Sequence, residues 1–246
     1  MFDVEEFARI APDWSRRLHY HKELGSTNDE ALRLCSSNPA EPLAVLTDFQ
    51  TSGRGRRGAA WMSEPGGGLL FSVVIKPRYE KKYWSRLALA SGLAISSVLR
   101  EQYGLLAEVK WPNDVLIEAR KCCGILVETQ GDYAVIGVGL NVTGSPQGDE
   151  SVSLSELTPR LGSRETLLAE LLTALTNEVN DCADQFEQQV GRLRELCFLE
   201  GKQITFKANG KIFTGLAEGI SDEGELMVNI DGQSISFLQA EEVRAV

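Results

Sequence analysis

The sequence predicts an α+β protein in which a mixed β-sheet domain packed with helices precedes a small β-barrel domain. In the first part of the chain, strand-like apolar runs are mixed with two long segments of helical periodicity. From Gly201 onward, short strand-like runs are separated by NG, DEG and DG turns, which is typical of a small all-β barrel. These two observations predict a boundary near residue 199, with domains 1–198 and 199–246.

The first half of the larger domain combines three strands with a short helix. Residues 18–24 alternate like a strand, and residues 26–28 (STN) are suitable caps for a helix that ends near Cys35. Residues 43–49 and 69–75 are continuous apolar runs of strand length. We therefore expect a strand, a helix and two further strands in this order.

The rest of the chain is predicted to contain the long helices and the remaining strands. Residues 84–104 have apolar side chains at a helical period, and Gly104 is a suitable C-cap. A second long helix is predicted over about 164–190, and a tight turn at WPND (111–114). The remaining strand-like runs are 105–111, 124–130, 133–142, 203–210, 211–220, 224–230 and 233–239.

Charge and composition restrict the possible partners. The chain has 25 basic and 35 acidic residues and a net charge of -10, which argues against general affinity for nucleic acid. The arginines within 54–57 are therefore a local feature that favours a small anionic ligand. No apolar run approaches the roughly 20 residues that span a bilayer, so we expect no membrane partner.

Cysteine and histidine usage predicts reduced thiols in a cytoplasmic protein. The five cysteines show no regular spacing, and the acidic N-terminal segment lacks the features of an export signal. With two histidines in the chain, a zinc site is not expected.

The string GRGRRG at 53–58 matches G-x-G-x-x-G, the dinucleotide-binding pattern, but its context does not. That pattern requires a helix after the glycines, whereas here Pro65 and three consecutive glycines precede the next strand. No Gly-Lys-Ser/Thr sequence supports a phosphate loop either. The string therefore predicts a loop between strands whose glycines allow close approach and whose arginines bind oxyanions; the alternative is a solvated basic loop.

Four further motifs accompany this loop: STN (26–28), Gln50, KWPND (110–114) followed by KCCGILVE (121–128), and GVGLN (137–141). In this order and spacing the chain resembles the biotin protein ligase family over nearly its whole length. The resemblance implies a biotin/lipoate ligase-like catalytic domain and an SH3-like C-terminal domain. It also implies that ATP activates biotin as biotinyl-5'-AMP, which is then transferred to a lysine of a biotin carboxyl carrier domain of a carboxylase.

The resemblance also implies roles for individual residues. The implied biotin site consists of Ser26, Thr27, Asn28, Gln50, Gly53, Arg54, Lys121, Gly124, Gly137 and Gly139. The implied ATP and adenylate site consists of Arg54, Arg56, Arg57, Trp61, Lys110, Asn113, Lys121 and Asn141. Lys121, Arg54 and Asp114 are the implied catalytic residues, with Asp114 placed to receive or orient the incoming lysine. Cations are required because a carboxylate and a phosphate must meet.

ATP and Mg²⁺ are the implied cofactors, and biotin is the implied substrate. The sequence identifies no Mg²⁺ ligands, which we expect to come mostly from nucleotide phosphates and water. Without the resemblance, Ser26 and Thr27 are interpreted as helix caps, Lys121 as a surface lysine, and Gly137 and Gly139 as packing glycines.

Two departures from the family pattern matter. The family commonly has another basic residue where this chain has Ala59, so one phosphate contact is either absent or supplied by Arg57. Cys122 and Cys123 replace apolar and small residues, and we expect them to act as small hydrophobes without a redox role. Too few residues precede the strand at 18–24 for a winged helix-turn-helix, which predicts no DNA partner.

The leading hypothesis is therefore a biotin protein ligase. The alternatives are a lipoate–protein ligase, a non-catalytic biotin-binding sensor, and an RNA-binding module that uses the arginines. Gln50 and the intact GRGRRG string favour biotin, and Lys121 with Arg54 favours catalysis. The sequence leaves both a monomer and a homodimer open.

Overall fold

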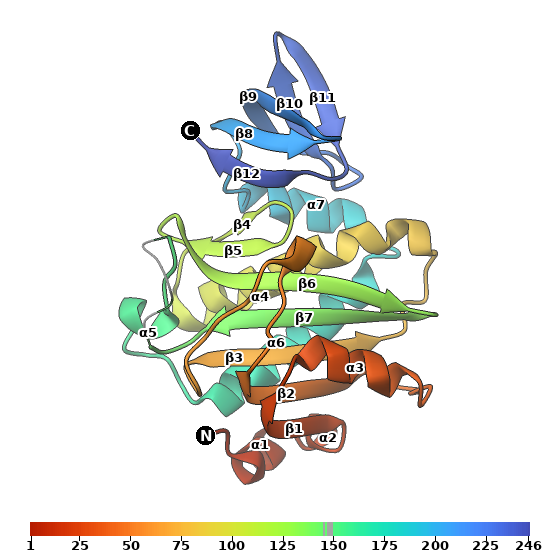
Figure 1. The fold of residues 1–246 in the computed structure, drawn as a ribbon, viewed down its shortest axis with the longest axis vertical. Helices are drawn as coiled ribbons and strands as arrows, with labels where there is room; N and C mark the ends of the chain where they lie inside the picture. Colours follow the sequence, from red (N-terminus) through yellow and green to blue (C-terminus); the bar gives the residue numbers. More distant parts are fainter. Residues whose placement is uncertain (145, 147–149) are drawn as a thin grey trace.

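The computed structural model describes residues 1–144, 146 and 150–246, which form two β-sheets flanked by helices (Figure 1). The larger sheet has the order β1-β2-β3-β7-β6-β5-β4, and the smaller has the order β11-β10-β9-β8-β12. The strands of the larger sheet are β1 (Leu18–Leu24), β2 (Leu43–Gln50), β3 (Gly68–Ile75), β4 (Ala107–Lys110), β5 (Asp114–Ile117), β6 (Arg120–Gln130) and β7 (Tyr133–Asn141). The strands of the smaller sheet are β8 (Gln203–Ala208), β9 (Lys211–Ile220), β10 (Leu226–Ile230), β11 (Gln233–Phe237) and β12 (Glu241–Ala245).

The helices lie on both faces of the larger sheet. They are α1 (Val4–Ile10), α2 (Pro12–Ser15), α3 (Thr27–Cys35), α4 (Leu87–Tyr103), α5 (Leu154–Leu157), α6 (Arg164–Asp181) and α7 (Phe186–Glu195), with short 3-10 helices η1 (Arg56–Gly58) and η2 (Lys81–Arg86). The larger sheet is mixed, because β1 and β2 are parallel while the other neighbours are antiparallel. No helix in the described ranges combines the length and apolar character needed to cross a bilayer.

Side chains of the central strands point alternately to the two faces of the larger sheet, so the apolar core is divided between these faces. Ala44 and Leu46 of β2 belong to the main apolar cluster, which includes residues of α4 and α6. Leu43 and Val45 of the same strand pack instead with Ala31 of α3. Because successive strand residues point to opposite faces, one helix layer covers each side of the sheet (Figure 1). The predicted α+β architecture is confirmed, and the all-β unit is a five-stranded antiparallel sheet with β11 and β12 at its edges.

The predicted WPND turn leads into β5, a strand that the sequence analysis missed. β5 has four residues, and it connects to β6 through Glu118 and Ala119, whose φ angles are 52° and 59°. Both residues therefore adopt the left-handed conformation that usually selects glycine or asparagine. Because neither glycine nor asparagine stands at these two positions, the sequence carries no signal for a hairpin here. The final strand, β12, was missed as well.

The single helix predicted over 164–190 is wrong, because α6 ends at Asp181 and α7 begins at Phe186. No proline or glycine marks this break in the sequence. The last carbonyl groups of α6 accept hydrogen bonds from side chains outside the helix: the Gln189 amide donates to Glu178 O at 2.6 Å, and the Tyr79 hydroxyl donates to Val179 O at 3.1 Å. These tertiary contacts replace the continued helix.

A second apolar cluster joins the two sheets across the predicted boundary near 199. It contains Leu93 of α4 and Trp111 together with Phe206 and Val228 of the smaller sheet. The Trp111 indole N–H also donates to Gly224 O at 3.1 Å. The boundary remains a prediction, and the two sheets share buried apolar surface on either side of it.

A buried ion pair anchors α6 to β2. Arg164 and Asp48 lie 3.1 Å apart with side chains 14% and 12% exposed, and Tyr20 donates to Asp48 at 2.6 Å. Arg164 also donates to Gly66 O and Gly68 O. Removing one partner of such a pair leaves the other charge buried and uncompensated.

We predict that Arg164→Met lowers the free energy of unfolding by about 3–5 kcal/mol, as measured by urea denaturation. Lys82→Met is the matched control, because Lys82 pairs with Glu80 where both side chains are well exposed. Equal urea midpoints for the two variants would contradict the prediction.

Candidate active site

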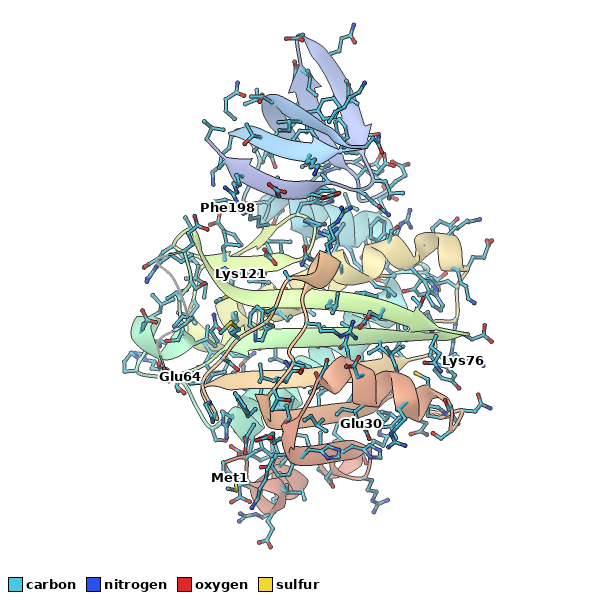
Figure 2. The ribbon with its side chains drawn as sticks, viewed as in Figure 1. Met1, Glu30, Glu64, Lys76, Lys121 and Phe198 are labelled. Carbon is cyan, nitrogen blue, oxygen red and sulfur yellow. The ribbon has the colours of Figure 1, made fainter. Side chains whose placement is uncertain are left out.

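A cavity of about 740 Å³ lies on the α3 side of the larger sheet and extends to the smaller one. Its walls are the start of α3, strands β6 and β7, the segment 54–61 and the segment 240–244. The segment 51–67 between β2 and β3, here called the arginine loop, contains η1 and crosses over β6 and β7 (Figure 1). Figure 2 shows Lys121 beside this loop and below the smaller sheet.

The polar floor of the cavity is a chain of hydrogen bonds. Gln50 Oε1 accepts from the backbone N–H and hydroxyl of Thr27 at 2.8 and 3.1 Å. Ser72 Oγ lies 2.8 Å from Thr27 Oγ1 and donates to Asn28 Oδ1 at 2.6 Å. Ser26 stands at the N-cap of α3, but its side chain makes no capping hydrogen bond. The helix-cap interpretation of Ser26 is therefore not supported, and Ser26 lines the cavity.

Three glycines allow side chains to lie flat on the sheet. Gly124 and Gly139 are paired across β6 and β7, and the Trp61 indole packs on both. A Cβ at Gly139 would overlap the indole, and one at Gly124 would lie 2.8 Å from it. A Cβ at Gly137 would overlap the Asn28 side chain. These predicted glycines therefore permit close approach by the protein's own side chains.

The cationic wall is formed by residues of the arginine loop and of the β4–β5–β6 meander. Lys121 Nζ lies 2.7 Å from Asp114 and 5.5 Å from the centre of a Trp61 ring. Arg56 donates to Asn113 Oδ1 at 2.9 Å. Burial lowers the pKa of Arg56, with a further contribution from neighbouring Arg57.

Lys110 is the third cation of this wall, and partial burial lowers its pKa as well. Partly dehydrated cations interact strongly with anions, because the effective dielectric constant is low where water is excluded. The wall is therefore suited to a ligand that carries a phosphate or a carboxylate.

Arg54 has two carboxylate partners that the sequence analysis missed. Its guanidinium donates to both oxygens of Glu128 at 2.9 and 2.7 Å, and to Asp29 at 2.6 Å. The hydrogen bond with Glu128 is the main reason that the pKa of Arg54 is raised. Glu128 is the last residue of the KCCGILVE motif. An acidic residue at the end of this apolar run was the available signal for a partner of Arg54.

Two predicted site residues lie outside the lining of this cavity. A Cβ at Gly53 would overlap the Trp61 carbonyl oxygen and would lie 2.9 Å from Gln50 Nε2, so this glycine permits the close approach of the Trp61 backbone and the Gln50 side chain. Asn141 lines a smaller cavity of about 130 Å³ with Met62 and Glu64, and its amide donates to Lys121 O at 3.5 Å. Asn141 is thus placed to support the Lys121 backbone. The other predicted residues line the main cavity: Ser26, Thr27, Asn28, Gln50, Arg54, Arg56, Arg57, Trp61, Lys110, Asn113, Asp114, Lys121, Gly124, Gly137 and Gly139.

The smaller sheet contributes a wall that the sequence analysis did not anticipate. Residues 240–244 line the cavity, and Glu241 forms an ion pair with Arg57. Arg57 has a φ of 56°, so the loop backbone is in a left-handed conformation where this contact forms. Arg57 therefore meets a carboxylate of the smaller sheet, whereas its proposed role in replacing a basic residue at Ala59 stays a prediction.

Comparison with known proteins agrees with this arrangement. The profile of the Biotin/lipoate A/B protein ligase family matches residues 22–141, and that of the Biotin protein ligase C terminal domain matches residues 201–240. A Bacillus subtilis protein named "Bifunctional ligase/repressor BirA" is 30% identical over 87% of this chain and 69% of its own length. This chain belongs to the biotin protein ligase family.

Two further proteins extend the comparison. A Mycobacterium tuberculosis relative, a biotin–acetyl-CoA-carboxylase ligase, is 29% identical over 89% of this chain and 86% of its own length. The solved structure of an Aquifex aeolicus biotin protein ligase in complex with biotin and ATP superposes with a TM-score of 0.83. That protein is 28% identical, and the alignment covers 94% of this chain and 100% of the other.

The described residues contain no group of three or more His, Cys, Asp and Glu side chains placed to hold a metal ion. Two of the acidic residues that line the cavity are paired with cations, Asp114 with Lys121 and Glu241 with Arg57. This donor set fits a Mg²⁺ ion carried by nucleotide phosphates and water, and does not fit a cage built from protein ligands.

We predict that the five cysteines of the native protein react slowly with iodoacetamide at about pH 8, because only a thiolate is nucleophilic. All five are buried, and burial raises the pKa of Cys122 and of Cys182 to about 12. The thiolate fraction therefore stays small until the pH approaches that value. Mass spectrometry should show full labelling after unfolding in urea. Rapid labelling of native Cys122 or Cys123 would contradict the prediction.

Proposed function

We propose that this chain is an ATP-dependent biotin protein ligase that forms biotinyl-5'-AMP and transfers biotin to a lysine of a carboxylase carrier domain. The observation that carries the proposal is one cavity with a polar floor at Thr27 and Gln50 and a cationic wall at Arg56 and Lys121. Biotin has a neutral ureido head and a terminal carboxylate, and these two surfaces are complementary to its two ends. The Aquifex relative is described in complex with biotin and ATP, and the Mycobacterium relative is named for a carboxylase substrate.

In the first step, the biotin carboxylate attacks the α-phosphate of ATP. An oxygen–phosphorus bond forms, the bond between the α- and β-phosphates breaks, and pyrophosphate leaves. Lys121 and Arg56 are proposed to bind the carboxylate and the α-phosphate, which reduces the repulsion between the two anions. The Trp61 indole N–H is buried and has no acceptor among the described residues, so it is a donor available to the adenylate. Mg²⁺ bound to the nucleotide would neutralise further phosphate charge.

In the second step, the carrier lysine attacks the carbonyl carbon of the anhydride. An amide bond forms, the carbonyl–phosphate bond breaks, and AMP leaves. The attacking amine must be neutral and must lose a proton, and Asp114 is proposed to accept it or to orient the amine. Asp114 lies 2.7 Å from Lys121 Nζ, so one ion pair connects the groups proposed for the two steps.

The alternatives differ in which part of the cavity they leave unexplained. A lipoate–protein ligase would not require the Thr27–Gln50 hydrogen bonds, because the lipoyl ring has no ureido group. A non-catalytic sensor would not require the Lys121–Asp114 pair. Nucleic acid is not a proposed partner, since the net charge is -10.

Strand β1 is paired on one side only, so its free edge is available to a second copy of the chain. Sedimentation of the protein with and without biotin and ATP would test for a homodimer.

The proposal is tested with purified protein, ATP, Mg²⁺, a biotin carboxyl carrier domain and either biotin or lipoate. We expect the acceptor to gain the mass of one biotinyl group, with no gain when its target lysine is replaced by arginine. A gain with lipoate but none with biotin would overturn the proposal in favour of the lipoate ligase. Biotin binding without any acceptor modification would favour the sensor.

Lys121→Gln should lower the rate of biotin-dependent ATP–pyrophosphate exchange by about 10²–10³-fold, because it removes a cation from the developing charge. Arg120→Gln is the matched control, since Arg120 precedes Lys121 on β6 but pairs with Glu118 and Glu156 instead of lining the cavity. Full exchange activity in Lys121→Gln would remove this residue from the mechanism.

A further inference from the structure

We infer that Glu128 is a positioning residue of the ligase site, which fixes the arginine loop by binding Arg54. The inference rests on the proposed function and assigns a role to the one charged residue of the GILVE segment (124–128). It also changes the role of Arg54, whose guanidinium faces two carboxylates and is thereby already neutralised. In this assignment Arg54 acts through the loop, and Arg56 and Lys121 meet the anionic substrates.

The Glu128–Arg54 contact has the geometry of a strong ion pair. Both Glu128 oxygens accept from separate guanidinium nitrogens, and the Glu128 side chain is 26% exposed. A bidentate contact fixes the orientation of the guanidinium as well as its position. Asp29 adds a third hydrogen bond from α3, but its side chain is 59% exposed, so we expect a smaller contribution from it.

The same carboxylate is bonded to the floor of the cavity. Glu128 Oε2 also accepts from the Asn28 amide at 2.8 Å, and that amide donates to Leu126 O at 3.3 Å. Asn28 Oδ1 in turn accepts from Ser72. Glu128 therefore joins the arginine loop to the hydrogen-bond chain that ends at Gln50.

The position of Arg54 determines where the other loop residues lie. Arg54 and Ala60 form an antiparallel bridge, and the Gly55 N–H donates to Ala59 O at 2.6 Å. The Trp61 N–H donates to Gly53 O at 2.9 Å. These bonds close a short backbone loop around Arg56. Holding Arg54 at Glu128 thus places Arg56 in the cationic wall and Trp61 on the glycine pair.

The inference is tested with Glu128→Gln, Arg54→Gln and the double variant. Hydrogen exchange of the peptide 51–64 reports on the loop, and the KM for biotin and the kcat in ATP–pyrophosphate exchange report on the site. We expect each single variant to speed hydrogen exchange in this peptide. Each should also raise the KM for biotin about tenfold while kcat changes little. The double variant should match the single variants, because both remove the same interaction.

Glu30→Gln is the matched control. Glu30 forms a bidentate pair with Arg33 on α3 one position from Asp29, and it does not line the cavity. It should leave the peptide 51–64 and the KM unchanged. Glu128→Asp keeps the charge and is expected to restore part of the affinity for biotin.

Several outcomes would overturn the inference. An unchanged rate of hydrogen exchange in residues 51–64 of Glu128→Gln would show that the loop does not depend on this carboxylate. Additive effects on KM in the double variant would show that Glu128 acts through Asn28 and not through Arg54. A wild-type protein that does not activate biotin would refute the proposed function. The hydrogen-exchange measurements would still decide whether Glu128 fixes the loop.

Discussion

Repulsion between like charges is the constraint on which the site depends. Lys110, Arg56 and Lys121 line one partly buried cavity, and each cation there disfavours its neighbours. The β4–β5–β6 meander makes this arrangement possible, because its register pairs Lys110 with Asp114 and places Lys121 on the next strand. Asp114 thereby lies among the cations and, with Glu150 of the same cavity, compensates them in part. The remaining positive charge is what an anionic ligand would neutralise.

Glycines provide the second requirement, a sheet surface on which side chains can lie flat. Gly124 and Gly139 are paired across two strands, so the Trp61 ring contacts backbone where other residues would place a Cβ. The arginine loop is therefore packed directly on the sheet. The strands supply a rigid surface together with Lys110 and Lys121, and the loop adds Arg56, so that neither element forms the cavity alone.

Strong local patterns made most of this protein predictable from its sequence. The predicted strands at 18–24, 43–49 and 69–75 are confirmed, and so is the Gly104 cap, whose φ is 68°. Most predicted site residues do line a single cavity. The failures occurred where tertiary contacts replace local signals, as in the left-handed Glu118–Ala119 turn and in the helix break after Asp181.

The ion pairs of the site could not be predicted from the sequence either. Arg54 and Glu128 are 74 positions apart, and Arg57 meets Glu241 from the other sheet. No periodicity or spacing rule connects residues so far apart along the chain. The motifs therefore indicated which residues gather at the cavity, but not which of them neutralise one another.

Trp111 illustrates how one motif serves two purposes. Its neighbours Lys110 and Asn113 face the cavity, whereas its own ring is 2% exposed in the apolar cluster shared by both sheets. Moving the sheets apart would expose this apolar surface to water, which is unfavourable. We therefore expect the two sheets to move as one body during turnover. Substrates would then enter and products leave by displacement of the arginine loop, and the lifetime of a reactive adenylate would depend on how seldom that loop opens.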